Sequence, residues 1–252
     1  MSSLARARSA LAQTGLTSRA RPVALLARPT GPPSHRLGLG ELLGPAAALR
    51  LPAALPRLAT APRGDGHVVI DLPGWRAPEA TAWGLRTYLR WLGYDARSWG
   101  LGTNGGSPER DTDRVATRVL AIAEEQGPVS LVGWSLGGVI AREVARREPE
   151  AVRRVVTYGS PVVGGPRYTA LARAYPRREL ERITRQGRAL DRDRPVRVPV
   201  TAVLSRRDGV VAWQACVDHA SPRVDHVEVG STHLGLGLDP DVWLTVARRL
   251  AD

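Results

Sequence analysis

A serine between two glycines is the residue of this chain best suited to nucleophilic chemistry. Ser135 is the centre of Gly133-Trp134-Ser135-Leu136-Gly137, a G-x-S-x-G pattern. With 26 glycines and 13 serines in 252 residues, chance alone gives roughly one such match in eight chains, so context must support the pattern. An apolar run at 129–133 leads into the serine, and a helical apolar pattern at 136–148 leads out of it. This order predicts a strand, a sharp turn and a helix, with the serine oxygen exposed at the turn.

A serine hydroxyl needs a base, and the base needs an orienting acid. His233 lies in Gly-Ser-Thr-His-Leu-Gly, a polar loop after an apolar run that ends at Val229. Asp208 lies in Arg-Arg-Asp-Gly-Val-Val, directly after the preceding apolar run. We therefore expect Asp208 to be the acid and His233 to be the base. The rivals for these roles, which do not follow the end of a strand, are His219, His226, Asp218 and Asp225.

Attack on a carbonyl also creates a negative oxygen, which backbone N–H groups can stabilise. The amide of Leu136, immediately after the nucleophile, is the first expected donor. The second is the amide of Trp75, in the loop after the first apolar run, with Arg76 as the second choice. The residues expected to contact substrate are Trp134, Arg76 and Asn104, the last in the glycine-rich loop 100–106.

The elements that must position these residues alternate between strand and helix. The pattern of apolar residues predicts strands at 67–72, 94–99, 129–133, 152–158, 198–204 and 224–229. Helical spacing predicts helices at 79–92, 109–126, 136–148 and 242–250. Such alternation favours an α/β fold with a mostly parallel, doubly wound sheet. The stretch 162–195 is too long for an ordinary connection, and we expect it to form a small helical lid over the carboxyl edge of the sheet.

The N-terminal part differs in composition from the rest of the chain. Residues 1–60 hold eight arginines and a single acid, Glu41, whereas the whole chain has a net charge of +12 and no lysine. We interpret residues 1–36 as a flexible basic extension and 37–252 as one domain. Residues 38–60 predict a short helix, broken at Pro52 and Pro56, that packs on the domain, with a membrane-facing helix as the alternative.

The basic charge, the single cysteine and the lengths of the apolar runs indicate which partners and compartment to expect. A basic surface attracts anionic lipid, acidic substrate or nucleic acid, but no nucleic-acid-binding motif is present, so we expect no nucleic-acid partner and leave peripheral membrane contact open. Cys216 is the only cysteine, so no intrachain disulfide can form. No apolar run reaches the roughly 20 residues of a membrane span, and no clear secretory signal is present, which favours a cytoplasmic protein.

Six segments, taken together and in order, resemble bacterial lipase/esterase-like α/β-hydrolases. They are VIDLPGW, WGLGTNGG, LVGWSLGG, TYGSPVVGG, SRRDGVV and VGSTHLGLG, and the resemblance covers about residues 37–252. It implies an eight-strand-type core with a small lid, and a triad of Ser135, Asp208 and His233. It also supports Trp75 and Leu136 as oxyanion donors. Many members of the superfamily have His-Gly in the oxyanion loop, where this chain has Pro73-Gly74.

The reaction expected from these residues is hydrolysis of a carboxylic ester through an acyl-enzyme, without a metal or cofactor. The expected substrate is a small-molecule or lipid-like ester. The fold alone does not fix the reaction, so two alternatives remain open. One is an acyltransferase that uses the same acyl-enzyme, and the other is a non-catalytic binding protein on a hydrolase scaffold.

Overall fold

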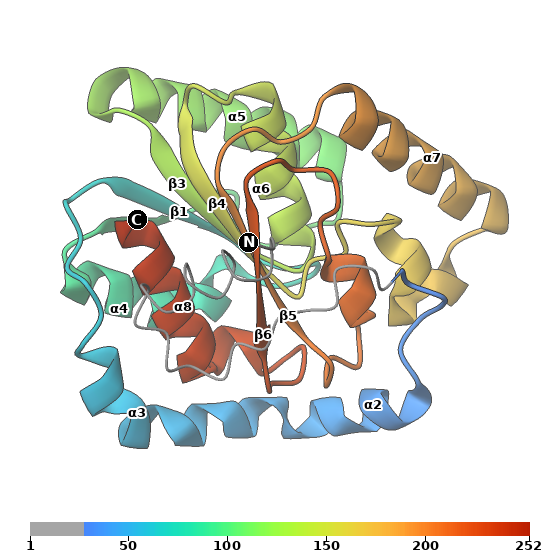
Figure 1. Cartoon of the computed structure of the whole chain (residues 1–252), viewed down its shortest axis with the longest axis horizontal. Helices are drawn as coiled ribbons and strands as arrows, with labels where there is room; N and C mark the ends of the chain where they lie inside the picture. The colour runs from blue at the N-terminus through green and yellow to red at the C-terminus, as the bar shows by residue number, and fades with distance from the viewer. Residues whose placement is uncertain (1–27) are drawn as a thin grey trace, which may run out of the picture.

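The computed structural model describes residues 28–252, and in this range six strands form one fully parallel sheet (Figure 1). The strands are β1 Val68–Leu72, β2 Asp95–Ser98, β3 Val129–Trp134, β4 Val152–Tyr158, β5 Val200–Ser205 and β6 Val224–Val229, in the order β2-β1-β3-β4-β5-β6. Each coincides with one of the six predicted strands. The predicted α/β class and parallel sheet are therefore confirmed.

The sheet is smaller than the eight-strand-type core that the family resemblance implies. Among the described residues, the segment ahead of β1 is helical from His35 to Leu58, and it adds no strand beyond β2. Leucine and alanine dominate this segment, and both favour helix over strand. The edge of the sheet is therefore β2 in the part of the chain that the structure describes.

Helices cover both faces of the sheet, as doubly wound sheets require. The helices η2 Glu79–Ala82, α4 Trp83–Leu92 and α8 Pro240–Ala251 lie on one side, and α5 Pro108–Gln126 with α6 Leu136–Arg147 lie on the other. Alternate side chains of β1 face opposite ways: Val69 packs with α4 and α8, while Val68 and Ile70 pack with α5 and α6. Burial on both faces explains why the strands appear in the sequence as nearly continuous apolar runs.

The N-terminal helical segment runs along one side of the molecule (Figure 1). It consists of α2 His35–Gly40, the 3₁₀ helix η1 Glu41–Arg50 and α3 Leu51–Leu58, which follow one another without a gap. The predicted breaks at Pro52 and Pro56 are wrong. Pro52 lies in the first turn of α3, where a missing N–H costs no helical hydrogen bond. Pro56 is exposed, so water can satisfy the carbonyl that it leaves unbonded.

This segment is packed on its inner side and apolar on its outer side. Leu58 is buried in the core formed with α4 and α8, as the packing prediction requires. Five leucines on the outside are 61–82% exposed: Leu39, Leu42, Leu43, Leu49 and Leu55. None of the helices that the structure describes is long and apolar enough to cross a membrane.

The long connection between β4 and β5 is helical, as predicted. It contains η3 Gly165–Tyr168, η4 Ala170–Ala174 and α7 Arg177–Asp193. The first two contact the loop after β5, since Ala170 N–H donates to Val210 O and Ala212 N–H donates to Tyr168 O. Helix α7 then leads back to the start of β5, and its last turn is hydrogen-bonded to Arg146 of α6.

Candidate active site

Ser135 lies at a sharp turn between β3 and α6. Its backbone is left-handed, with φ 53° and ψ −120°, an uncommon conformation for any residue except glycine. A Cβ added to Gly133 would lie 2.4 Å from the backbone of Gly138, and one added to Gly137 would lie 2.2 Å from the carbonyl oxygen of Leu72. Both glycines of the pattern are therefore needed so that β1, β3 and α6 can approach closely. The turn has the form of a nucleophile elbow.

Asp208 and His233 form a buried hydrogen-bonded pair at the ends of β5 and β6. Asp208 Oδ2 lies 2.7 Å from His233 Nδ1, and the two residues are 2% and 3% exposed. The other carboxylate oxygen of Asp208 accepts from the backbone N–H groups of Val210 and Val211, which fixes its orientation. With Nδ1 donating to the carboxylate, Nε2 of His233 has the free lone pair that a general base needs.

The pair lies next to the elbow. The indole of Trp134, the residue before the serine, is 5.5 Å from the His233 ring, centroid to centroid. A Cβ on Gly159, just after β4, would lie 3.0 Å from His233 Nδ1. In the described residues no hydrogen bond joins Ser135 Oγ to His233. Such bonds are often long in ligand-free enzymes and tighten when substrate binds.

Two backbone amides near the serine are available for an oxyanion. Within residues 28–252, the N–H groups of Leu136 and Trp75 donate to no protein acceptor. The N–H of Arg76 donates to the carbonyl oxygen of Asn104 at 2.9 Å, so it is already used. An amide that is already hydrogen-bonded is a poorer oxyanion donor, so Trp75 stays the predicted donor, ahead of Arg76.

The structure gives Asn104 a different role from the expected substrate contact. Its side chain is fully buried, its Nδ2 donates to Pro73 O at 2.8 Å, and its Oδ1 accepts from Gly106 N–H at 3.0 Å. Because the side chain is buried and both ends of its amide bind backbone groups, Asn104 supports the loop after β1 in this structure. The two partners of Asn104 lie 2 and 31 positions away in the sequence, and local spacing does not reveal the second.

The other residues expected to contact substrate, Arg76 and Trp134, and the neighbouring Trp75 are closer to the serine or more exposed than Asn104. Trp75 is 42% exposed, and the Arg76 guanidinium lies 5.2 Å from the centre of its ring. The ring of Trp134 packs against Gly74, and its Nε1 is buried without a hydrogen-bond partner among the described residues. A substrate contact by Trp75, Arg76 or Trp134 stays a prediction.

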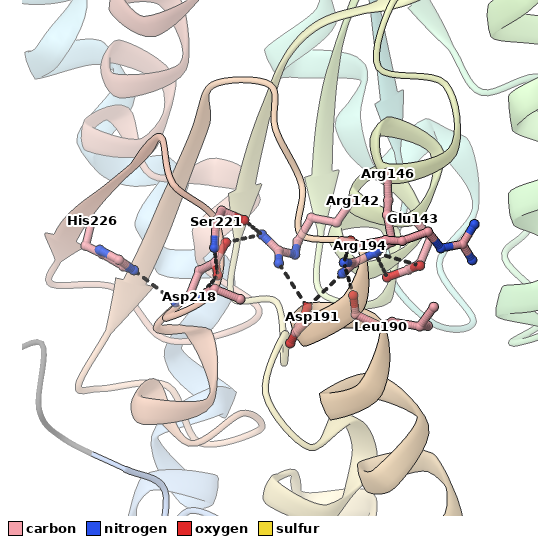
Figure 2. A network of polar contacts seen from close by, with 10 residues as sticks. Arg142, Glu143, Arg146, Leu190, Asp191, Arg194, Asp218, Ser221 and His226 are labelled. Carbon is pink, nitrogen blue, oxygen red and sulfur yellow. Dashed lines mark hydrogen bonds and ion pairs between the residues drawn. The ribbon is translucent and has the colours of Figure 1, made fainter.

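The rival acid Asp218 belongs to a separate network (Figure 2). Its carboxylate pairs with Arg142 of α6, which also faces Asp191 of α7, and its backbone N–H donates to His226 Nε2 at 2.9 Å. Burial raises the pKa of Asp218, but the charge of Arg142 and the hydrogen bonds from Ser221 and Ala220 outweigh it and lower the pKa to about 2. Burial lowers the pKa of His226. This network ties α6 to α7 and includes neither Asp208 nor His233.

One residue of the site was not singled out from the sequence. Glu41 of η1 accepts hydrogen bonds from the backbone N–H groups of Gly209, His233 and Leu234. The available signal was that it is the only acid among the first 60 residues. Burial of a carboxylate is costly unless hydrogen-bond donors compensate it, so a buried Glu41 must accept hydrogen bonds.

The parallel sheet, the elbow after β3 and the late acid and histidine loops define the α/β-hydrolase fold. Solved structures agree. A structure of the metagenome-derived lipolytic enzymes LipS and LipT has a TM-score of 0.59 at 17% identity and covers 76% of this chain and 94% of that one. Mouse alpha/beta hydrolase domain-containing protein 10 has a TM-score of 0.53 at 20% identity, with 75% and 91% covered.

Proteins similar to this chain in sequence are named as esterases. No protein-family model matches the chain. The pimeloyl-acyl-carrier-protein methyl ester esterase of Aromatoleum aromaticum is 34% identical over 92 residues, which is 36% of each chain. That of Klebsiella pneumoniae is 43% identical over 63 residues, or 24% of this chain and 23% of the relative. The chain thus matches about a third of the length of these relatives or less.

Proposed function

We propose that this protein is a serine hydrolase that cleaves carboxylic esters through an acyl-enzyme. The observation that carries the proposal is the buried hydrogen bond between Asp208 and His233 beside the strained turn of Ser135. The esterase names of the sequence relatives support an ester substrate. A methyl ester is accordingly one substrate to test.

The reaction would proceed in two halves. His233 Nε2 takes the proton of Ser135 Oγ as that oxygen attacks the ester carbonyl carbon, and the N–H groups of Trp75 and Leu136 stabilise the oxyanion. The tetrahedral intermediate collapses, and the leaving alcohol takes the proton from His233. Water then attacks the acyl-enzyme with His233 again as base, which releases the carboxylic acid and restores the serine.

The first experiment measures hydrolysis of p-nitrophenyl esters of increasing acyl length, together with a methyl ester. Ser135→Ala is expected to abolish turnover and labelling by a fluorophosphonate. Ser107→Ala is the matched control, because the Ser107 side chain makes no capping hydrogen bond. Full turnover in Ser135→Ala would remove Ser135 from the nucleophile role, and a folded wild type that neither turns over nor labels would refute the proposal.

A second pair of variants separates the two candidate acids. Asp208→Asn leaves the shape of the site but favours the wrong tautomer of His233, so kcat should fall by about 10³–10⁴-fold. Asp218→Asn should keep kcat near the wild-type value and lower stability, since it removes the closer of the two carboxylates that pair with the buried Arg142. The reverse pattern would assign the acid role to Asp218. Product analysis with an added alcohol distinguishes hydrolysis from acyl transfer.

A further inference from the structure

The 3₁₀ helix η1 points one row of residues at the catalytic loops. A 3₁₀ helix repeats every three residues, so Glu41, Gly44, Ala47 and Arg50 share its inner side. Glu41 is 7% exposed, and Gly44 is also buried, whereas Leu42, Leu43 and Leu49 face outward. The only carboxylate of the N-terminal segment is therefore directed into the protein.

The carboxylate of Glu41 joins the acid loop to the base loop. Its Oε1 accepts from the N–H of Gly209 at 2.6 Å and from the N–H of His233 at 2.9 Å. Its Oε2 accepts from the N–H of Leu234 at 2.8 Å. A single oxygen atom thus binds the residue after the acid and the base itself.

Two glycines make this close approach possible. A Cβ on Gly209 would lie 2.3 Å from the carbonyl oxygen of Leu37, and a Cβ on Gly44 would lie 2.7 Å from Cβ of Leu234. Helix α2 therefore touches the acid loop and η1 touches the base loop, and Glu41 lies where the two loops meet.

We infer that Glu41 is a positioning residue for the reaction proposed above, on which this inference rests. Asp208 uses one oxygen to hold its own turn, so the bond to His233 depends on the other oxygen alone. That bond depends on the spacing of the two loops, and Glu41 fixes this spacing through the backbone on both sides. Displacement of a catalytic group by about 1 Å can cost about 10²-fold in rate.

The test compares Glu41→Gln, Glu41→Ala and Leu58→Ala with the wild type. Glutamine has the same size but only one acceptor oxygen, so it presents N–H donors where an acceptor is needed. We expect kcat on a p-nitrophenyl ester to fall about tenfold in Glu41→Gln and about a hundredfold in Glu41→Ala, with KM within about twofold. Leu58→Ala loosens the same helical segment at a buried site away from the loops. Assayed well below the melting temperature of this variant, its kcat should stay within about twofold of the wild-type value.

A second readout does not need activity. The low-field proton resonance of the His233–Asp208 hydrogen bond should broaden or shift in Glu41→Gln and remain in Leu58→Ala. Wild-type kcat and resonance in a folded Glu41→Gln would overturn the inference, and so would an equal loss of kcat in Leu58→Ala. A wild type without ester turnover would refute the proposed function instead, and the resonance would still decide the role of Glu41.

Discussion

The strained turn at Ser135 predicts that glycine at this position gives a more stable protein than alanine does. The backbone of Ser135, with φ 53° and ψ −120°, is of the kind that costs a non-glycine residue about 1–3 kcal/mol. Glycine avoids this cost, but it makes the unfolded chain more flexible by about 0.4–1 kcal/mol. Alanine keeps the strain. Ser135→Gly should therefore be more stable than Ser135→Ala by about 1 kcal/mol, although both variants lack the nucleophile.

The assay is thermal unfolding of the two variants side by side. For a protein of this size, 1 kcal/mol corresponds to a rise of about 2–4 °C in Tm, so Ser135→Gly should melt that much above Ser135→Ala. The Ser135 N–H donates to Tyr158 O at 2.9 Å, and this bond is available to both variants, which makes alanine a fair reference. A Ser135→Gly protein that melts at or below Ser135→Ala would refute the stored strain at the elbow.

Three further outcomes follow from packing and charge. Gly137→Ala forces a Cβ toward Leu72 O, so this variant should have a lower kcat and be less stable than the wild type by about 1–3 kcal/mol. A Gly137→Ala protein that unfolds in urea like the wild type would contradict the close approach. The pKa of Asp218 is lowered from 3.8 to about 2 in the folded protein, so the carboxylate stabilises the fold by about 2 kcal/mol above pH 3.8 and loses this contribution as the pH falls toward 2. The stability of Asp218→Asn in urea should therefore depend less on pH between pH 4 and 2 than that of the wild type. An unchanged pH dependence would contradict the lowered pKa. Leu58 is 2% exposed and Leu42 is 82% exposed. Leu58→Ala should therefore lower the free energy of unfolding by about 2–5 kcal/mol, and Leu42→Ala should lower it by less than about 0.5 kcal/mol. Equal losses of stability in urea would contradict this packing.

Most of the sheet was predictable because its central strands β1, β3, β4 and β5 are buried on both faces. Such strands appear as short apolar runs, and all six segments predicted as strands became strands. The positions of Ser135, Asp208 and His233 followed from the same pattern, because the carboxyl ends of parallel strands meet at one edge. Their proposed roles depend on the order in which these segments follow one another along the chain, which a single sequence displays directly.

The remaining parts of the site depend on contacts between distant segments. Asn104 was expected to touch substrate, but Pro73, 31 positions earlier, takes its side-chain donor. Pro52 was expected to break a helix, but it falls in a first turn, where proline is tolerated. In both cases the residue type was informative, and its partner or its exact place in the helix decided the outcome.

Glu41 gives the strongest example of such a long-range contact. It lies 168 positions from Gly209 and 192 from His233, so no local pattern connects them. Its segment is also held by Arg50, which pairs with Asp239 and Asp241 at the start of α8. Glu41 thus contributes to the attachment of residues 35–58 and, on the inference above, to the alignment of the acid–base pair, whereas Arg50 contributes to the attachment alone. A change that loosens the helix at Glu41 should therefore reduce catalysis before it unfolds the sheet, because β5 and β6 remain paired along six residues without it.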